Sequence, residues 1–172
     1  MSWRRWGWPV IMVRAIPDML ASYADMLEAD PAFPDNWLNI RVPENYAALG
    51  AEQKGDFLID MMAPWYASYF ATWMEYAAQS ADVLVLQYDE FRRDPAATLM
   101  RLLAHSGMPR SRAHCQVALD GVWEERDSFR YKQGVWGRGR TRFTPQQIVR
   151  LERQLDFYPG LAGMKAALIP PP

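Results

Sequence analysis

A run of four apolar residues at positions 10–13 passes almost at once into a helix. The run, VIMV, has the length and the β-branched content of a buried strand. Pro17 and Asp18 then supply a first-turn proline and an acid that favour a helix start, and we expect this helix over residues 17–28. Arg14 therefore lies at the carboxyl end of a strand, the edge at which open α/β sheets bind ligands.

A second apolar run, at residues 83–87, predicts a parallel partner for the first strand. Residues 52–79, between the runs, repeat apolar side chains at helical spacing, and Pro64 is expected to kink or divide that helix. Asp94 and Pro95 begin another helix after the second strand. Two strands joined by a long helical crossover indicate a doubly wound α/β fold, with a parallel sheet flanked by helices.

Composition is consistent with one domain over residues 1–172, since half of the chain is hydrophobic. Nineteen basic and twenty acidic residues give a net charge of -1, which disfavours a protein that coats nucleic acid through bulk charge. Cys115 is the only cysteine, so an internal disulfide and a multi-cysteine zinc site are excluded. No apolar run approaches the roughly 20 residues of a membrane span, and the first ten residues lack the apolar core of a signal peptide. We expect a cytoplasmic protein without metal or membrane association.

Arg14 and Ser22 can converge on one anion. Arg14 follows the strand and Ser22 lies one to two turns into the helix, so a guanidinium and a hydroxyl can meet outside the sheet. Such a pair suits a phosphate. In the other interpretation Arg14 only caps the turn and Ser22 faces water, and these two residues alone leave both interpretations open.

Residues 126–144, RDSFRYKQGVWGRGRTRFT, are rich in basic side chains and glycines. The basic residues and glycines are Arg126, Arg130, Lys132, Arg138, Arg140, Arg142, Gly134, Gly137 and Gly139. Glycines let backbone N–H groups approach an anion closely and arginines supply forked donors, so this segment can wrap an anion. It can also be read as a solvated basic loop or, from its interleaved aromatic residues, as a surface for single-stranded nucleic acid.

Aromatic side chains recur along the helix expected at 52–79, and we expect this row to pack in the core. The row consists of Phe57, Met61, Trp65, Tyr69, Trp73 and Tyr76. Aromatic residues at helical spacing bury themselves more often than they stack on a ligand. His105 and His114 are interpreted as ordinary surface or packing residues of later helices.

The order and spacing of these regions resemble the sulfotransferases that use 3'-phosphoadenosine 5'-phosphosulfate (PAPS) as sulfuryl donor. The resemblance runs from residue 9 to about residue 155 and covers the carboxyl-terminal two-thirds of that family's domain. Its 3'-phosphate motif is an arginine, an aspartate four residues on and a serine eight residues on, and Arg14, Asp18 and Ser22 match this spacing. The family's proline falls one place later here, at Pro17.

Two later motifs of the family also have counterparts. The Tyr-Glu-Asp element after the second strand corresponds to Tyr88-Asp89-Glu90, and the resemblance implies that Tyr88 lies near the adenine side of the donor site. The late Arg-Lys-Gly loop and the Phe-Thr that begins the last helix correspond to Lys132, Gln133, Gly134, Gly137, Phe143 and Thr144, with Gln133 departing from the usual lysine.

The resemblance implies a P-loop-NTPase-like sulfotransferase fold that transfers a sulfuryl group from PAPS to a hydroxyl or amine, releasing PAP. The donor site would comprise Arg14, Ser22, Tyr88, Lys132, Gln133 and Gly134, with no metal. The family's phosphosulfate-binding loop and its usual catalytic base have no counterpart before Arg14, so no catalytic residue is assigned and we expect an N-terminally truncated domain. A small molecule or a carbohydrate is the expected acceptor.

Two other functions remain open. The chain can be a non-catalytic module that binds PAP, another phosphonucleotide or a partner chain, and a single-stranded nucleic-acid binder is less favoured. A sheet without its first strand should expose an apolar edge, which favours a homo-oligomer or a partner chain that covers it. The family's dimer motif would fall at residues 140–149, but Pro145 and Val149 depart from it.

Overall fold

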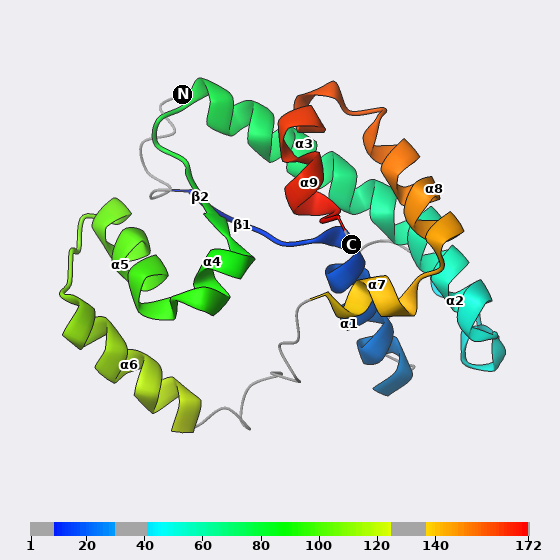
Figure 1. Cartoon of the computed structure of the whole chain (residues 1–172), viewed down its shortest axis with the longest axis horizontal. Helices are drawn as coiled ribbons and strands as arrows, with labels where there is room; N and C mark the ends of the chain where they lie inside the picture. Colours follow the sequence, from blue (N-terminus) through cyan, green and yellow to red (C-terminus); the bar gives the residue numbers. More distant parts are fainter. Residues whose placement is uncertain (1–8, 30–40, 125–136, 172) are drawn as a thin grey trace. The chain divides into compact units, whose positions relative to one another are not determined.

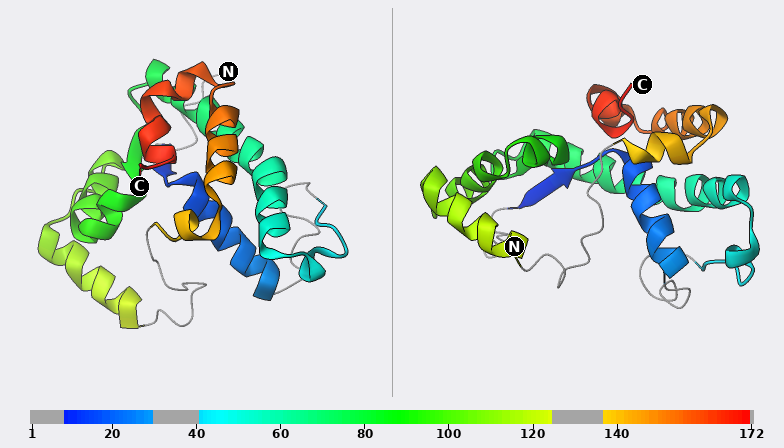
Figure 2. Two further views of the ribbon diagram at one scale, coloured as in Figure 1. Left: turned by 45° about the vertical axis from the view of Figure 1, so that its right-hand side comes forward. Right: turned by 60° about the horizontal axis from the view of Figure 1, so that its bottom comes forward.

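The structure is a computed structural model that describes residues 9–29, 41–124 and 137–171. The described residues are mostly helical, with one small parallel sheet (Figures 1 and 2). Residue contacts divide the chain into two compact units. The sheet unit takes its residues from 1–13 and 75–135, and the helical unit takes its residues from 14–74 and 136–172.

The sheet unit is built on two strands, β1 (Val10–Val13) and β2 (Leu84–Gln87). They run parallel, in a register that pairs Val10 with Leu84 and Val13 with Gln87. The predicted parallel pairing is therefore confirmed, and β2 begins one residue later than expected. Along β1 the side chains alternate between exposed and buried, so the apolar run is covered on one face.

Three helices follow β2 in the sheet unit: α4 (Tyr88–Arg93), α5 (Pro95–His105) and α6 (Arg112–Glu124). The carboxylate of Asp94 accepts a hydrogen bond from the Ala97 N–H at 3.0 Å, so the predicted helix start is confirmed. Its other oxygen pairs with Arg112 at 2.8 Å, at the first residue of α6. This carboxylate links the starts of α5 and α6, which lie side by side in Figure 1.

The helical unit contains the remaining elements. They are α1 (Ile16–Ala29), η2 (Tyr46–Ala48), α2 (Ala51–Phe57), η3 (Leu58–Met62), α3 (Ala63–Gln79), α7 (Arg138–Arg142), α8 (Pro145–Leu155), η5 (Pro159–Met164) and α9 (Lys165–Leu168). Helix α3 crosses the boundary, since its residues up to 74 belong to the helical unit and the rest to the sheet unit. The first helix thus extends one residue beyond the predicted range at each end. None of the helices in the described ranges combines the length and the apolar character that crossing a lipid bilayer requires.

Pro64 divides the long helical stretch as predicted, and the structure shows how. The five residues of η3 form a π-helical turn, in which the Ala63 N–H donates to the Leu58 carbonyl. Proline has no N–H and its ring clashes with the carbonyl four residues earlier, so an α-helical turn is disfavoured just before it. The wider π turn lies between α2 and α3 and accommodates Pro64, the second residue of α3, without ending the helical path.

Helix α8 is held against α2 through Gln147. Thr144 caps α8, since its hydroxyl accepts a hydrogen bond from the Gln147 N–H at 3.2 Å. The Gln147 amide donates to the Glu52 carbonyl at 2.9 Å and to Asp56 Oδ1 at 3.0 Å. Arg150 donates to the same Asp56 oxygen at 2.6 Å. Asp56 of α2 thus accepts hydrogen bonds from two side chains of α8.

The prediction that the aromatic row packs in the core was wrong. Met61, Trp65, Tyr69 and Tyr76 are all exposed, at 38% or more of their surface. The buried side chains of the same stretch lie on another face, at Leu58, Ile59, Met62, Ala63, Ala67 and Phe70. Both faces are apolar, so helical periodicity alone could not tell which of them meets the rest of the helical unit.

Candidate anion-binding site

Arg14 and Ser22 lie at the start of the helical unit. Arg14 follows β1 directly and is partly buried, close enough to Tyr66 of α3 for its charge to act on the phenol. Burial raises the pKa of Tyr66, Tyr23 adds to that rise, and the positive charge of Arg14 opposes it. Ser22 lies on α1, four residues after Asp18, so the two share one face of the helix. A guanidinium and a hydroxyl thus flank the first turns of α1, whose N-terminus favours negative charge.

The end of the basic, glycine-rich segment docks on this helix. Asp18, only 2% exposed, accepts two backbone hydrogen bonds from it. The Gly137 N–H donates to Oδ2 at 2.9 Å and the Gly139 N–H donates to Oδ1 at 2.8 Å. These contacts connect residues that are about 120 positions apart in the sequence, and they bring α7 against α1 in all views of Figures 1 and 2.

Gly139 is required for this approach. A Cβ atom at this position would lie 2.2 Å from the Pro17 carbonyl carbon, 2.4 Å from the Pro17 oxygen and 2.6 Å from the Asp18 nitrogen. Atoms of two backbones cannot yield as a flexible side chain can, so any residue with a Cβ separates α7 from α1. Gly137, which precedes α7, has φ 78° and suits a glycine for conformational reasons.

The arginines of α7 divide into two sets. Arg138 pairs with Asp25 of α1, and Arg142 pairs with Asp25 and with Glu28. Arg140 lies 200° around the helix from each of them, by the 100° turn of an α-helix per residue. It is partly buried, and within the described residues its Nε atom has no hydrogen-bond partner and it has no ion pair. Arg140 is therefore a cation of the docked segment that the contacts with α1 leave available.

The remaining predicted residues lie elsewhere. Tyr88 belongs to the sheet unit, where it begins α4 and its ring lies 6.3 Å from that of Phe91. Val13, which precedes Arg14, is paired in the sheet with Gln87, which precedes Tyr88. Lys132, Gln133 and Gly134 lie outside the described residues.

Asp18, Gly137 and Gly139 make contacts in the structure that the sequence did not predict. In the sequence Asp18 is a helix-start acid and a motif position, whereas in the structure its partners are backbone N–H groups of a distant segment. Its burial is the signal that sequence reasoning lacked, because an aspartate in a first turn is ordinarily exposed. The spacing of Gly137 and Gly139 was visible, but which atoms each glycine approaches was not.

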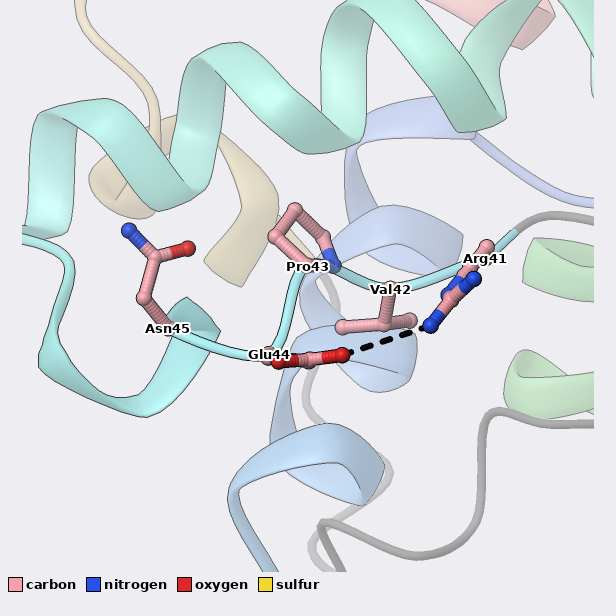
Figure 3. A pocket seen from close by; sticks show the side chains of 5 residues that line it. All are labelled: Arg41, Val42, Pro43, Glu44 and Asn45. Atoms are coloured by element: carbon pink, nitrogen blue, oxygen red, sulfur yellow. Dashed lines mark hydrogen bonds and ion pairs between the residues drawn. The ribbon is translucent and has the colours of Figure 1, made fainter.

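Two other features of the described residues do not form a site for an anion or a metal. A shallow pocket is lined by residues 41–45, and in Figure 3 Arg41 and Glu44 point toward each other across it. They pair at 3.3 Å and their side chains are 85% and 91% exposed, so this pair is open to water and its two charges offset each other. Among the described residues, no group of three His, Cys, Asp or Glu side chains is arranged to hold a metal ion.

The chain was compared with known proteins in three ways. No family model, no curated protein and no solved structure matches it.

Proposed function

We propose that this protein is related to the PAPS-dependent sulfotransferases and binds the 3'-phosphate of PAPS and PAP at the start of α1. The observation that supports the proposal is the docking of α7, through Gly137 and Gly139, on the helix that carries the Arg-Asp-Ser spacing. That spacing and the late glycine-rich segment are separate motifs in the sequence. Gly137 and Gly139, at the end of that segment, lie in the same unit as the Arg-Asp-Ser spacing, as a shared phosphate site requires.

The chemistry of the site fits a phosphate dianion. Arg14, just before α1, offers a fork of N–H donors, Ser22 of α1 a hydroxyl donor, and Arg140 of the docked α7 a second guanidinium. Lys132, Gln133 and the backbone at Gly134 complete the proposed set, and Tyr88 is proposed for the adenine side. Each charge-assisted contact of this kind contributes about 1.5–3 kcal/mol, so a few contacts suffice to distinguish a 3'-phosphorylated nucleotide from one without that group.

For the intact protein we propose sulfuryl transfer to a hydroxyl or amine of a small molecule or carbohydrate. The acceptor oxygen or nitrogen attacks the sulfur of PAPS, the bond between sulfur and the bridging oxygen breaks, and PAP leaves with that oxygen. The acceptor proton passes to a base, for which we assign no residue. The proposed fold is accordingly the P-loop-NTPase-like fold of that family, and β1, Arg14 and α1 form the strand–turn–helix unit at its donor site.

Calorimetric titration with PAP and with 5'-AMP tests the binding proposal. We expect the protein to prefer PAP, and we expect Arg14→Ala to reduce this preference by roughly 10- to 100-fold, as the loss of one or two charged contacts implies. Arg41→Ala is the matched control, because it removes the same charge from an exposed side chain of the same unit.

Equal affinity for PAP and 5'-AMP in the wild-type protein would contradict the proposal. So would an Arg14→Ala protein that keeps the preference. Binding of oligonucleotides that weakens steeply with salt, in the absence of any preference for PAP, would instead favour a nucleic-acid surface. Incubation with PAPS and a panel of hydroxyl and amine acceptors then separates an enzyme, which releases PAP, from a module that binds the nucleotide without turnover.

A further inference from the structure

Asp18 is committed to protein contacts rather than to a ligand. Each of its carboxylate oxygens accepts a backbone N–H, from Gly137 at 2.9 Å and from Gly139 at 2.8 Å, and the side chain is buried. Its negative charge would also repel a phosphate. The aspartate at the centre of the Arg-Asp-Ser spacing therefore serves the anion site in some way other than by touching the anion.

The contacts of Asp18 differ in kind from the other contacts between α1 and α7. Arg138 and Arg142 reach Asp25 and Glu28 through long side chains that are 22–29% exposed, and such contacts tolerate shifts of the backbone. Asp18 holds the backbone itself, at two positions on either side of the first residue of α7. It therefore determines where the chain enters α7.

Gly139 fixes how closely the backbone of α7 approaches the backbone of α1. Because a Cβ at Gly139 would overlap the backbone of Pro17 and Asp18, the two chains are in direct contact at the point where Asp18 accepts its hydrogen bonds. Arg140 follows immediately, with its Nε buried and without a partner in the described part of the chain. The position of Arg140 is thus set by the two contacts next to it.

We propose that Asp18 is a positioning residue that clamps the start of α7 onto α1, so that Arg140 faces the same anion as Arg14 and Ser22. This inference rests on the proposed 3'-phosphate site. The clamp explains why an acidic residue lies within a site for an anion. The negative charge of Asp18 is stabilised by backbone N–H groups and by the N-terminus of α1, and the role of Asp18 is to hold cations in place.

Asp18→Asn tests the clamp with a side chain of almost the same size. One carboxylate oxygen becomes an NH2 group, which cannot accept the hydrogen bond of Gly137 or Gly139. We expect the amide protons of these two glycines to exchange with solvent at least about tenfold faster. We also expect the preference for PAP over 5'-AMP to fall by at least about tenfold, while affinity for 5'-AMP changes little.

Asp56→Asn is the matched control. Asp56 is also an aspartate of the helical unit that receives two hydrogen bonds, from Gln147 and Arg150, but it holds α8 rather than α7. We expect this variant to lower the thermal midpoint and to leave the nucleotide preference unchanged. A purely structural role of Asp18 would affect both variants alike, in the midpoint and not in the preference.

Gly137→Ala provides a second variant if Asp18→Asn does not fold. A Cβ at Gly137 meets no atom within 4 Å, so the substitution only strains the positive φ of the turn that Asp18 holds. A smaller loss of the PAP preference, in the same direction, is expected.

The outcomes separate the two proposals. If the wild-type protein has no preference for PAP, the proposed function fails, whereas the exchange of the Gly137 and Gly139 amides still reports whether Asp18 holds them. If the wild-type protein prefers PAP and the folded Asp18→Asn and Gly137→Ala proteins keep that preference in full, the positioning role is overturned and the proposed function stands.

Discussion

Tyr46 shows how burial of one polar group makes stability depend on pH. It is 4% exposed, its ring meets Phe57 edge-on at 5.5 Å, and within the described residues its hydroxyl has no hydrogen-bond partner. Burial, and next the nearby charge of Glu28, raise the pKa of Tyr46 to about 12. In the unfolded chain the phenol ionises near pH 10. The stability that the neutral phenol contributes is therefore complete below pH 10 and is lost as the pH rises to about 12.

Tyr46→Phe should remove this loss. Up to pH 9 we expect the variant to be as stable as the wild-type protein or slightly more stable, because a buried hydroxyl without a partner is replaced by hydrogen. Between pH 10 and 12 the wild-type protein should lose about 1–3 kcal/mol relative to the variant. Urea unfolding across this range measures the difference, and parallel alkaline curves for the two proteins would contradict it.

Helix α3 presents two apolar faces of which the structure buries one. Phe70 is 2% exposed and belongs to the buried face, whereas Trp65 is 40% exposed and stacks on Tyr69, with ring centroids 5.4 Å apart. Because the free energy of packing follows the surface removed from water, aromatic side chains of similar hydrophobicity should contribute very differently at these two positions.

Phe70→Ala should therefore destabilise the protein by about 3–5 kcal/mol, and Trp65→Ala by about 1 kcal/mol, most of it from the lost stacking. Both values come from the free energy of unfolding in urea. Equal losses would show that the aromatic row is covered in solution, as the helical periodicity alone had suggested.

The two units differ in how much apolar surface they bury. Among the described residues, the fully buried apolar side chains of the sheet unit are Ile11, Val13, Leu86, Ala96 and Cys115. The helical unit holds all the other buried apolar side chains, from α1, η2, η3, α3, α8, η5 and α9 and from residues that flank helices, such as Phe143. Local stability follows buried contacts, so the sheet unit should open at a lower free energy than the helical unit.

Cys115 reports this opening directly. It is the only cysteine of the chain and its side chain is fully buried in α6. A thiol reagent should react with Cys115 through an opening that leaves the amides of α1 and α3 protected. The free energy of this opening should be at least about 1.4 kcal/mol lower than the free energy of the opening that exposes those amides. Thiol labelling measured next to hydrogen exchange tests this. Identical opening free energies would show that the two units unfold together.

Local chemistry in the sequence determined much of the outline of this protein. The strand–turn–helix at Arg14, the divided helix at Pro64 and the capped helix after Asp94 follow from contacts within a few residues, and the structure has each of them. The parallel pairing of the two apolar strands was also predictable, because a helical crossover between them allows little else. The Arg-Asp-Ser spacing on α1 was also visible in the sequence, and the anion site that it predicts stays a prediction.

Only the tertiary structure decided which face of α3 is buried and what Asp18 holds. Both faces of α3 have the same helical periodicity, and the choice between them depends on the surface that packs against them. The partners of Asp18 are 119 and 121 residues away, and their N–H groups become donors to it only because Gly139 lets two backbones touch. Periodicity and spacing describe a chain in one dimension, whereas close approach between distant segments depends on how whole elements pack.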